Sequence, residues 1–317
     1  MPDCGAVICY RMSIDVFDPR FADVTRGAGE LQRLCTGALW SEGPVWLRED
    51  HSLLWSDIPN NRMLRWHAET GMTVWRDGVE FTNGHVREAD GSLLHCSHGL
   101  RAIVRTRFGP GLQPLGDEVL VSHYQGRRLN SPNDVVVKRD GSIWFTDPPY
   151  GILSSREGHQ AESELGANHV FRFDPVTKEL RIVSAFIEEP NGLAFSPDES
   201  ALYASDTSAA TRTDGSGNHH IVAFDVIGDQ ELANPRVFAV VEPGLPDGFR
   251  VDVQGFLYTS SEDSVQVYHP DGTRIGQIAV PEKVGNLVFG GAYGDELFIC
   301  ASTSLYRMRL NTRGATA

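Results

Sequence analysis

The sequence predicts an all-β protein, a six-bladed β-propeller whose ring is closed by an N-terminal strand that completes the last blade. Three observations carry this prediction. A short two-strand unit occurs six times, its copies begin at the spacing of propeller blades, and a spare strand precedes the first copy. Glycine is also plentiful, at 32 of 317 residues, as tight turns between antiparallel strands require.

Each unit begins with a polar residue beside a glycine or aspartate, or once an asparagine, and continues into alternating apolar residues. A turn such as Asp90-Gly91 or Asp140-Gly141 follows, and a second apolar run then ends in small polar residues. Two short strands joined by a tight turn give this pattern. The opening residues lie 38 to 58 residues apart, a blade period with insertions in the middle blades: Glu42, Asn83, Asn133, Asn191, Asp247 and Gly285.

Further strand-like runs supply the outer strands of the blades. Residues 169–173 and 180–183 follow the third unit, for example, and residues 305–308 follow the sixth. The sixth unit then lacks a fourth strand. Residues 31–35 form an unused strand before the first unit and are predicted to fill that place, which leaves few open sheet edges.

The ring predicts one propeller domain at residues 25–312, because a ring cannot be divided without exposing sheet edges. An N-terminal extension at residues 1–24 and a C-terminal tail at 313–317 flank it, and we expect residues 1–11 to be dispensable. The irregular stretches 148–168 and 207–219 are predicted to be loops over one face.

Composition excludes several classes of protein. The 28 Lys and Arg residues against 42 Asp and Glu residues give a net charge of −14, which argues against a nucleic-acid partner. No run of about 18 apolar residues predicts a membrane span, and no signal peptide is visible, so a cytoplasmic or periplasmic monomer or homodimer is expected. The five cysteines include no C-x-x-C pair, so no structural zinc site is predicted.

The first strand of each propeller blade lines the central channel, so the six opening residues should converge at one mouth. Five of them carry side-chain oxygens, and Glu42 and Asp247 are carboxylates. Two neighbouring buried carboxylates are unfavourable unless a proton or a cation compensates their charge. Hard oxygen ligands favour one divalent cation, with Ca²⁺ first, Mg²⁺ or Mn²⁺ next and Zn²⁺ as a further alternative. The plainer alternative is that the Asn-Gly and Asp-Gly pairs only form turns.

Asp247 is the candidate catalytic residue, because a carboxylate beside a cation can accept a proton from water or attack directly. His98, Arg101 and Asn130 lie near the repeat units and are candidates for the rim of the mouth. No G-x-S-x-G elbow, phosphate-binding loop or dinucleotide fingerprint is present.

Several stretches resemble the SMP-30/gluconolactonase/luciferin-regenerating-enzyme-like family, and the gluconolactonase branch in particular. The similar stretches, in order, are residues 41–46, 129–134, 141–151, 190–196 and 246–248. The resemblance covers roughly residues 25–310 and implies a six-bladed propeller with one catalytic divalent metal in its channel.

By this resemblance the protein hydrolyses a sugar lactone such as glucono-1,5-lactone. Glu42, Asn191 and Asp247 fall on the family's metal ligands, Asn133 falls on a further ligand or substrate-binding position, and Asp247 is the implied base or nucleophile. The resemblance and the predicted mouth together give the substrate-binding candidates Asn83, His98, Arg101, Asn130, Asn133 and Tyr150. The chain departs from the family at His85, where an apolar residue is more usual.

Two alternatives remain open at this point. A related ring could hydrolyse another ester or an organophosphate, because the same metal polarises P=O as readily as C=O. A non-enzymatic propeller could serve as a binding module, although such a protein needs no converging oxygen ligands.

Overall fold

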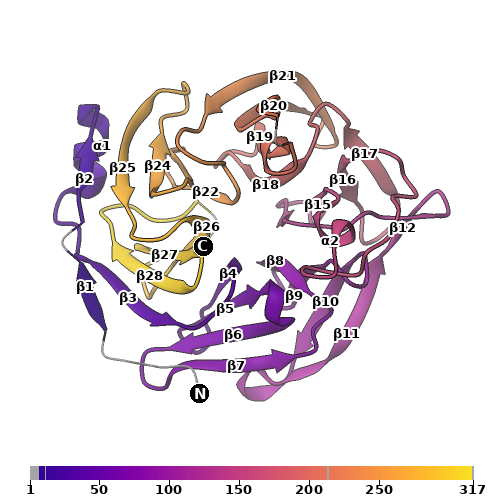
Figure 1. Cartoon of the computed structure of the whole chain (residues 1–317), viewed down its shortest axis with the longest axis horizontal. Coiled ribbons are helices and arrows are strands. Elements are labelled where there is room, and N and C mark those ends of the chain that lie inside the picture. The colour runs from indigo at the N-terminus through magenta and orange to yellow at the C-terminus, as the bar shows by residue number, and fades with distance from the viewer. Residues whose placement is uncertain (1–6, 11, 213, 316–317) are drawn as a thin grey trace.

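The computed structural model describes residues 7–10, 12–212 and 214–315, which fold as a six-bladed β-propeller (Figure 1). Every blade is an antiparallel sheet whose first strand lies innermost. Blade 1 consists of β4 (Ser41–Leu47), β5 (Ser52–Asp57), β6 (Arg62–His67) and β7 (Gly71–Asp77). Blade 2 consists of β8 (Thr82–Arg87), β9 (Leu93–Ser97), β10 (Ala102–Phe108) and β11 (Pro114–Val121). Blade 3 consists of β14 (Val135–Val137), β15 (Ile143–Asp147), β16 (His169–Phe173) and β17 (Leu180–Ser184).

The remaining blades follow the same order. Blade 4 consists of β18 (Pro190–Phe195), β19 (Ala201–Asp206), β20 (His220–Ile227) and β21 (Glu231–Val240). Blade 5 consists of β22 (Phe249–Val251), β23 (Leu257–Thr259), β24 (Ser264–Tyr268) and β25 (Arg274–Ala279). Blade 6 consists of β26 (Val284–Gly290), β27 (Glu296–Ala301), β28 (Ser304–Arg309) and β3 (Leu31–Thr36). A short hairpin of β12 (His123–Tyr124) and β13 (Arg127–Arg128) connects blades 2 and 3.

The ring closes as the repeat predicted. β3 pairs antiparallel with β28, with Cys35 opposite Leu305, so the N-terminal strand supplies the missing fourth strand of blade 6. Two more N-terminal strands add a fifth strand each: β1 (Ile8–Tyr10) pairs with β3, and β2 (Ile14–Val16) pairs with β25. Residues 1–6 and 11 of the predicted extension, and 316–317 of the predicted tail, lie outside the described residues.

The core consists of apolar clusters that lie between neighbouring blades. Successive side chains of a strand point to opposite faces of its sheet, so Leu53 and Trp55 of β5 pack toward blade 6 while Leu54 packs toward blade 2. Helix α1 (Pro19–Thr25) adds Phe21 and Val24 to the cluster between blades 5 and 6. Burying each such side chain stabilises the fold by roughly 1.5–3 kcal/mol. Side chains on both faces of a blade are buried because a neighbouring blade covers each face.

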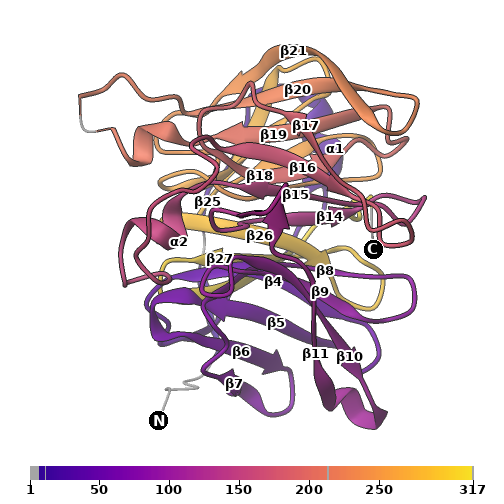
Figure 2. The ribbon, with the colours of Figure 1, turned by 90° about the vertical axis from the view of Figure 1, so that its right-hand side faces the viewer.

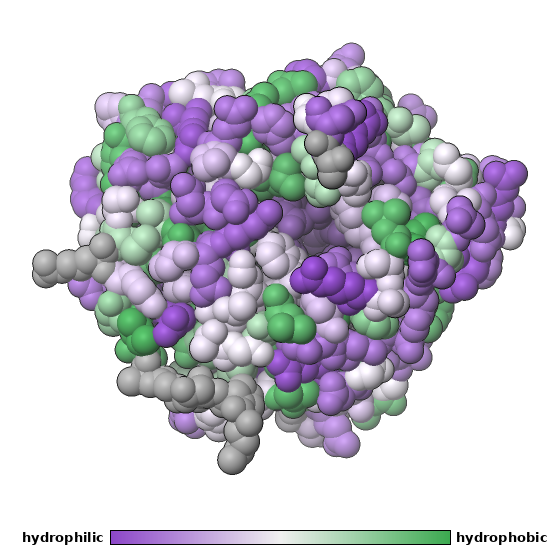
Figure 3. All heavy atoms as spheres, viewed as in Figure 1, coloured by the Kyte–Doolittle hydropathy of each residue, from purple (hydrophilic) through white to green (hydrophobic). Residues whose placement is uncertain are grey.

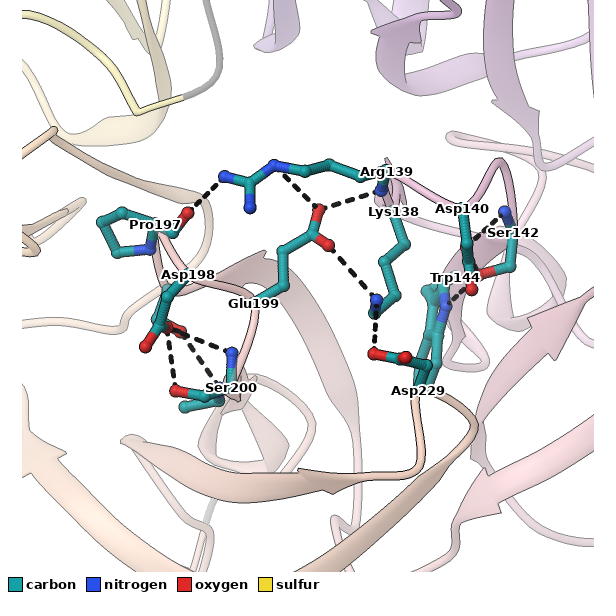
Figure 4. Close-up of polar contacts among 12 residues, drawn as sticks. Lys138, Arg139, Asp140, Ser142, Trp144, Pro197, Asp198, Glu199, Ser200 and Asp229 are labelled. Atoms are coloured by element: carbon teal, nitrogen blue, oxygen red, sulfur yellow. Dashed lines mark hydrogen bonds and ion pairs between the residues drawn. The ribbon is translucent and has the colours of Figure 1, made fainter.

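Charged turns also join blades, as Figure 4 shows for blades 3 and 4. Lys138 is 5% exposed and lies 2.8 Å from Asp229 Oδ1 and 3.2 Å from Glu199 Oε2. Glu199 Oε1 also accepts a hydrogen bond from the Arg139 backbone N–H at 2.9 Å. Burial lowers the pKa of Lys138, but its bonds to Asp229 and Glu199 outweigh that effect and raise it. These turns lie at the ends of the strands opposite to the opening residues.

The other face carries the mouth of the channel. Helix α2 (Tyr150–Leu153) and the loop between β19 and β20 extend from this same face in Figure 2, where the stretches 148–168 and 207–219 were predicted to lie. Figure 3, which views this face, shows a polar hollow near the centre of the ring. Among the described residues, no helix is long and apolar enough to cross a bilayer.

Candidate active site

The innermost strands bring the opening residues together at the mouth. Each innermost strand contacts the next around the whole ring. Glu42, Asn83 and Asn191 are the second residues of β4, β8 and β18. Asn133 and Asp247 lie two residues before β14 and β22. The glutamate and the three asparagines are 3% to 7% exposed, whereas Asp247 is partly exposed.

Groups from the preceding blade hold the backbone carbonyls of the opening residues. The N–H groups of Gly84 and Gly192 donate to the Asn133 and Asp247 carbonyls at 2.8 and 3.0 Å. Side-chain hydroxyls at the ends of the second strands do the same: Ser56 for Asn83 at 3.0 Å, Thr146 for Asn191 at 2.6 Å, and Ser205 for Asp247 at 3.2 Å. The small polar residues that end the second apolar runs therefore fix the opening residues.

The aspartates that end three of these strands hold the loops that enter the blades. Each carboxylate accepts a backbone N–H a few residues before an opening residue, and such charge-assisted bonds are strong. The pairs are Asp57 with Leu39 at 2.8 Å, Asp147 with Asn130 at 2.8 Å, and Asp206 with Glu188 at 3.0 Å. The mouth is thus built on a hydrogen-bonded frame.

Glu42 presents one carboxylate oxygen to the axis. Its Oε2 accepts hydrogen bonds from the Gly43 N–H and the Asn286 side chain, both at 3.0 Å. Its Oε1 is buried and has no hydrogen-bond partner among the described residues. Burial, followed by the charge of Asp247, raises the pKa of Glu42 well above its ordinary value. A Cβ at Gly285 would overlap this Oε1, so the opening residue of blade 6 must be glycine to leave room for it.

Asn191 and Glu42 both lie within hydrogen-bonding reach of Asp247. The Asn191 Nδ2 atom donates to Thr207 Oγ1 at 3.2 Å, which leaves its Oδ1 atom without a donor in the described part of the chain. The Asn133 backbone N–H donates to the Thr146 carbonyl at 2.9 Å. The carboxylates of Glu42 and Asp247 and the side-chain amide of Asn191 therefore meet at the axis.

Asn83 and His98 form a second polar pair at the mouth. The His98 Nδ1 atom lies 2.9 Å from the Glu157 carbonyl and must donate to it, so Nε2 accepts from Asn83 Nδ2 at 3.3 Å. Burial lowers the pKa of His98 to about 4, which keeps the ring neutral. The bond through Nδ2 leaves the Asn83 side-chain oxygen for a ligand.

Arg101 and Asn130 lie behind the mouth, in its frame. The Arg101 side chain is 5% exposed, and its Nε donates to the Leu129 and Asn130 carbonyls at 2.6 and 3.1 Å. The Asn130 Nδ2 atom donates to the Ala167 carbonyl at 2.9 Å, and its Oδ1 accepts from Ser163 at 2.6 Å. Their side chains thus tie the 163–168 loop to the segment that carries Asn133.

Tyr150, the other substrate-binding candidate, contacts protein as well. Its hydroxyl lies 2.6 Å from Thr207 Oγ1, the atom that holds Asn191. Burial raises the pKa of Tyr150 well above its ordinary value, so the hydroxyl stays protonated.

Charges around Asp247 set its proton affinity. Burial raises the pKa of Asp247 to about 7, while Lys283 lowers it and Glu157 raises it. Glu157 belongs to the loop after α2 and is partly buried, and burial raises its own pKa. Lys283 lies just before β26 and pairs with Glu262 at 3.4 Å.

Sequence reasoning missed four residues of this region. Asn286 and Thr207 hold Glu42 and Asn191, Glu157 faces Asp247, and His85 Nδ1 bonds the Gly43 carbonyl at 2.6 Å. Two had a signal. Asn286 stands where four other units have glycine, and His85 was noted as an unusual residue in a channel strand. Nothing in the local sequence marks Thr207 or Glu157.

The donor set fits a hard divalent cation. The buried Glu42 Oε1 is an acceptor without a donor in the described residues, beside Asp247, whose charge makes Glu42 harder to ionise. No three His, Cys, Asp or Glu side chains gather as a metal cluster in residues 7–10, 12–212 and 214–315. Carboxylate and amide oxygens without histidine or thiolate suit calcium or magnesium better than zinc.

Comparison with known proteins gives close relatives over nearly the whole chain. The sequence is 33% identical to a gluconolactonase of Zymomonas mobilis, over 95% of this chain and 87% of that protein. A solved gluconolactonase from Xanthomonas campestris superimposes with a TM-score of 0.86 at 38% identity, covering 97% of this chain and 98% of that one. A pentonolactonase of Haloferax volcanii is 29% identical over 83% of this chain and 82% of that protein. The model of the SMP-30/Gluconolactonase/LRE-like region matches residues 40–303, and the chain belongs to this family.

Proposed function

We propose that the protein is a metal-dependent hydrolase of sugar lactones, similar to gluconolactonases. The named relatives support lactone hydrolysis. The observation that carries the metal is the buried, unpartnered Glu42 Oε1 beside Asp247 and Asn191. Glu42, Asn191 and Asp247 would hold the cation, with Asn133 as a further ligand or a substrate contact, and calcium is the ion that we propose first.

A bound divalent cation would polarise the lactone carbonyl and stabilise the developing oxyanion. Asp247 accepts a proton from the attacking water as the water oxygen bonds to the carbonyl carbon. The bond from that carbon to the ring oxygen then breaks, and Asp247 returns the proton to the leaving oxygen, which gives the open-chain acid. Burial raises the pKa of Asp247 to about 7 without a cation, and a bound cation would lower that pKa and keep the carboxylate ionised as a base at neutral pH.

Substrate hydroxyls would contact the polar groups around the hollow. The Asn83 side-chain oxygen, held in place through His98, can accept from a hydroxyl, and Asn133 can donate or accept. Asn130 and Tyr150 act through the frame in this proposal, because the structure directs their polar groups to protein partners. Arg101 Nε does the same, whereas its buried Nη2 atom has no hydrogen-bond partner in the described residues and could donate to a substrate hydroxyl.

The test compares substrates with and without a chelator. Glucono-1,5-lactone should be hydrolysed, activity should fall on chelation, and added calcium should restore it. Asp247→Asn should abolish turnover while the unfolding temperature is kept, and Asp295→Asn, in a surface pair with Arg309, should behave as the wild type. If the protein hydrolyses a phosphotriester but no lactone, it is a different metal-dependent esterase. If it turns over no substrate and binds no cation, it is a binding module.

A further inference from the structure

A chain of polar side chains runs from Asn191 away from the axis. Asn191 Nδ2 donates to Thr207 Oγ1 at 3.2 Å, and Thr207 Oγ1 lies 2.6 Å from the Tyr150 hydroxyl. Tyr150 in turn lies close enough to Glu189 to interact with its carboxylate. Thr207 is 1% exposed. Asn191 belongs to β18, Thr207 directly follows β19, Tyr150 begins α2, and Glu189 lies in the loop before β18.

The far end of this chain supplies acceptors for the hydroxyl protons of Thr207 and Tyr150. Glu189 Oε1 accepts from Thr211 Oγ1 at 2.6 Å, and Oε2 is buried without a hydrogen-bond donor in the described residues. The Tyr150 hydroxyl can donate to the Thr207 carbonyl at 3.4 Å or to the nearby Glu189 carboxylate, which only accepts. The Tyr150 oxygen can then accept from Thr207, and the Thr207 oxygen accepts from Asn191. Each hydroxyl donates once, away from the axis.

This direction matters for an amide more than for a carboxylate. The two ends of an asparagine side chain have nearly the same shape, but one is an acceptor and the other a donor. A flipped Asn191 would aim N–H groups at a cation, whereas either oxygen of Glu42 can serve as a ligand. An amide ligand therefore needs a neighbour that accepts from one end and leaves the other free.

We propose that Thr207 and Tyr150 are positioning residues that orient the Asn191 amide by holding its Nδ2 atom, which leaves Oδ1 for a cation beside Glu42 and Asp247. This inference rests on the proposed function, since it concerns the cation that these residues would hold. It also gives α2 a role. The helix starts at Tyr150, in the loop that follows the second strand of blade 3, so the mouth loop of one blade orients a ligand of the next.

The test measures cation affinity directly, by calorimetric titration of chelator-treated protein with Ca²⁺. Thr207→Val removes the hydroxyl at nearly constant volume and should weaken binding about 10- to 100-fold, the usual effect of losing a group that orients a metal ligand. Thr207→Ser keeps the hydroxyl and should bind Ca²⁺ as the wild type does. Tyr150→Phe should weaken binding by a smaller factor than Thr207→Val.

Two matched controls remove the same groups elsewhere. Thr106→Val deletes a buried hydroxyl that donates to Asp117 at 2.6 Å in blade 2. Tyr258→Phe deletes a buried hydroxyl that donates to Asp252 at 3.1 Å in blade 5. Both should bind Ca²⁺ as the wild type does. The unfolding temperature of each cation-free variant shows whether it is folded.

The outcomes separate the two proposals. If the wild type binds Ca²⁺ and a folded Thr207→Val variant binds it equally well, the positioning role is overturned while the proposed function stands. If the wild type binds neither Ca²⁺, Mg²⁺ nor Mn²⁺, both fail together. If Thr207→Val does not fold, the other two variants decide. Weaker Ca²⁺ binding by Tyr150→Phe together with wild-type binding by Thr207→Ser supports the positioning role. Wild-type binding by both variants overturns it.

Discussion

Asn286 of the last blade donates its side-chain N–H to Glu42 Oε2 of the first blade at 3.0 Å, across 244 positions of sequence. The same oxygen accepts the Gly43 N–H, so Oε1 is the oxygen left for a ligand. Asn286 also orders its own backbone, because its Oδ1 accepts the Leu287 N–H at 2.8 Å. One amide of the last blade thus orients the first carboxylate across the closed ring.

Replacing this amide should weaken the site without opening the ring. We expect Asn286→Ala to lower cation affinity and kcat/KM by about 10- to 100-fold, because Glu42 loses the group that fixes its rotamer. Asn286→Asp should be worse, since a third carboxylate would face Glu42. Asn311→Ala, which removes an exposed amide bond to the Asp23 carbonyl, should change neither quantity. Wild-type affinity in Asn286→Ala would contradict the role.

The blade pattern was predictable because it is local. Alternating apolar residues and Asp-Gly turns mark each hairpin within about a dozen residues, and counting the strands predicted that residues 31–35 complete blade 6. The structure has β3 in that place, paired with β28. Convergence of the opening residues followed from the ring alone, since equivalent positions of a ring approach one axis.

The partners of individual side chains were not predictable in the same way. Arg101 and Asn130 suggested a polar rim, but their partners lie in other segments, the 129–130 carbonyls and the 163–167 loop. Thr207 and Glu157 contribute to the mouth only through contacts between blades. A sequence pattern shows which strand a residue belongs to, whereas these roles depend on loop conformations.

Buried histidines of blade 2 should make the fold sensitive to acid. Burial lowers the pKa of His85 to about 4 and lowers that of His95, which also feels the charge of His85. The unfolded chain binds these protons near pH 6.5 and the folded chain only at lower pH, so stability is present above pH 6.5 and lost as the pH falls. Each such group contributes about 2 kcal/mol between pH 6.5 and 5.

His95→Leu should therefore flatten the pH dependence of the unfolding free energy. Urea titrations at several pH values between 5 and 7.5 would measure this slope, which is independent of any constant change in stability. His123→Leu is the matched control, because His123 is exposed on β12. A steeper loss of stability toward acid in His95→Leu would contradict the assignment.

Glu157 should tune the acid limb of catalysis. Its negative charge raises the pKa of Asp247, so Glu157→Gln should lower that pKa and move the acid limb of the kcat/KM profile to lower pH by a fraction of a unit. Glu162→Gln changes the same loop at an exposed carboxylate and should leave the limb in place. A shift to higher pH in Glu157→Gln would mean that Glu157 does not face the base.

The buried charges between blades 3 and 4 should contribute to stability alone (Figure 4). Glu199 is 12% exposed at its side chain and bonds Lys138, which keeps Asp229 as its other partner. We expect Glu199→Gln to lower the free energy of unfolding by about 1–3 kcal/mol, because a largely buried ammonium group loses one of its two anions.

Chemical denaturation would measure this loss, and lactone hydrolysis should be unchanged because these turns lie at the far ends of the strands. Glu179→Gln provides the control, because Glu179 forms an ion pair with Arg181 at 2.7 Å in which both side chains are nearly half exposed. Such exposed pairs are screened by solvent and contribute little to stability. An equal loss of stability in the two variants would show that burial of Lys138 adds nothing to the pair.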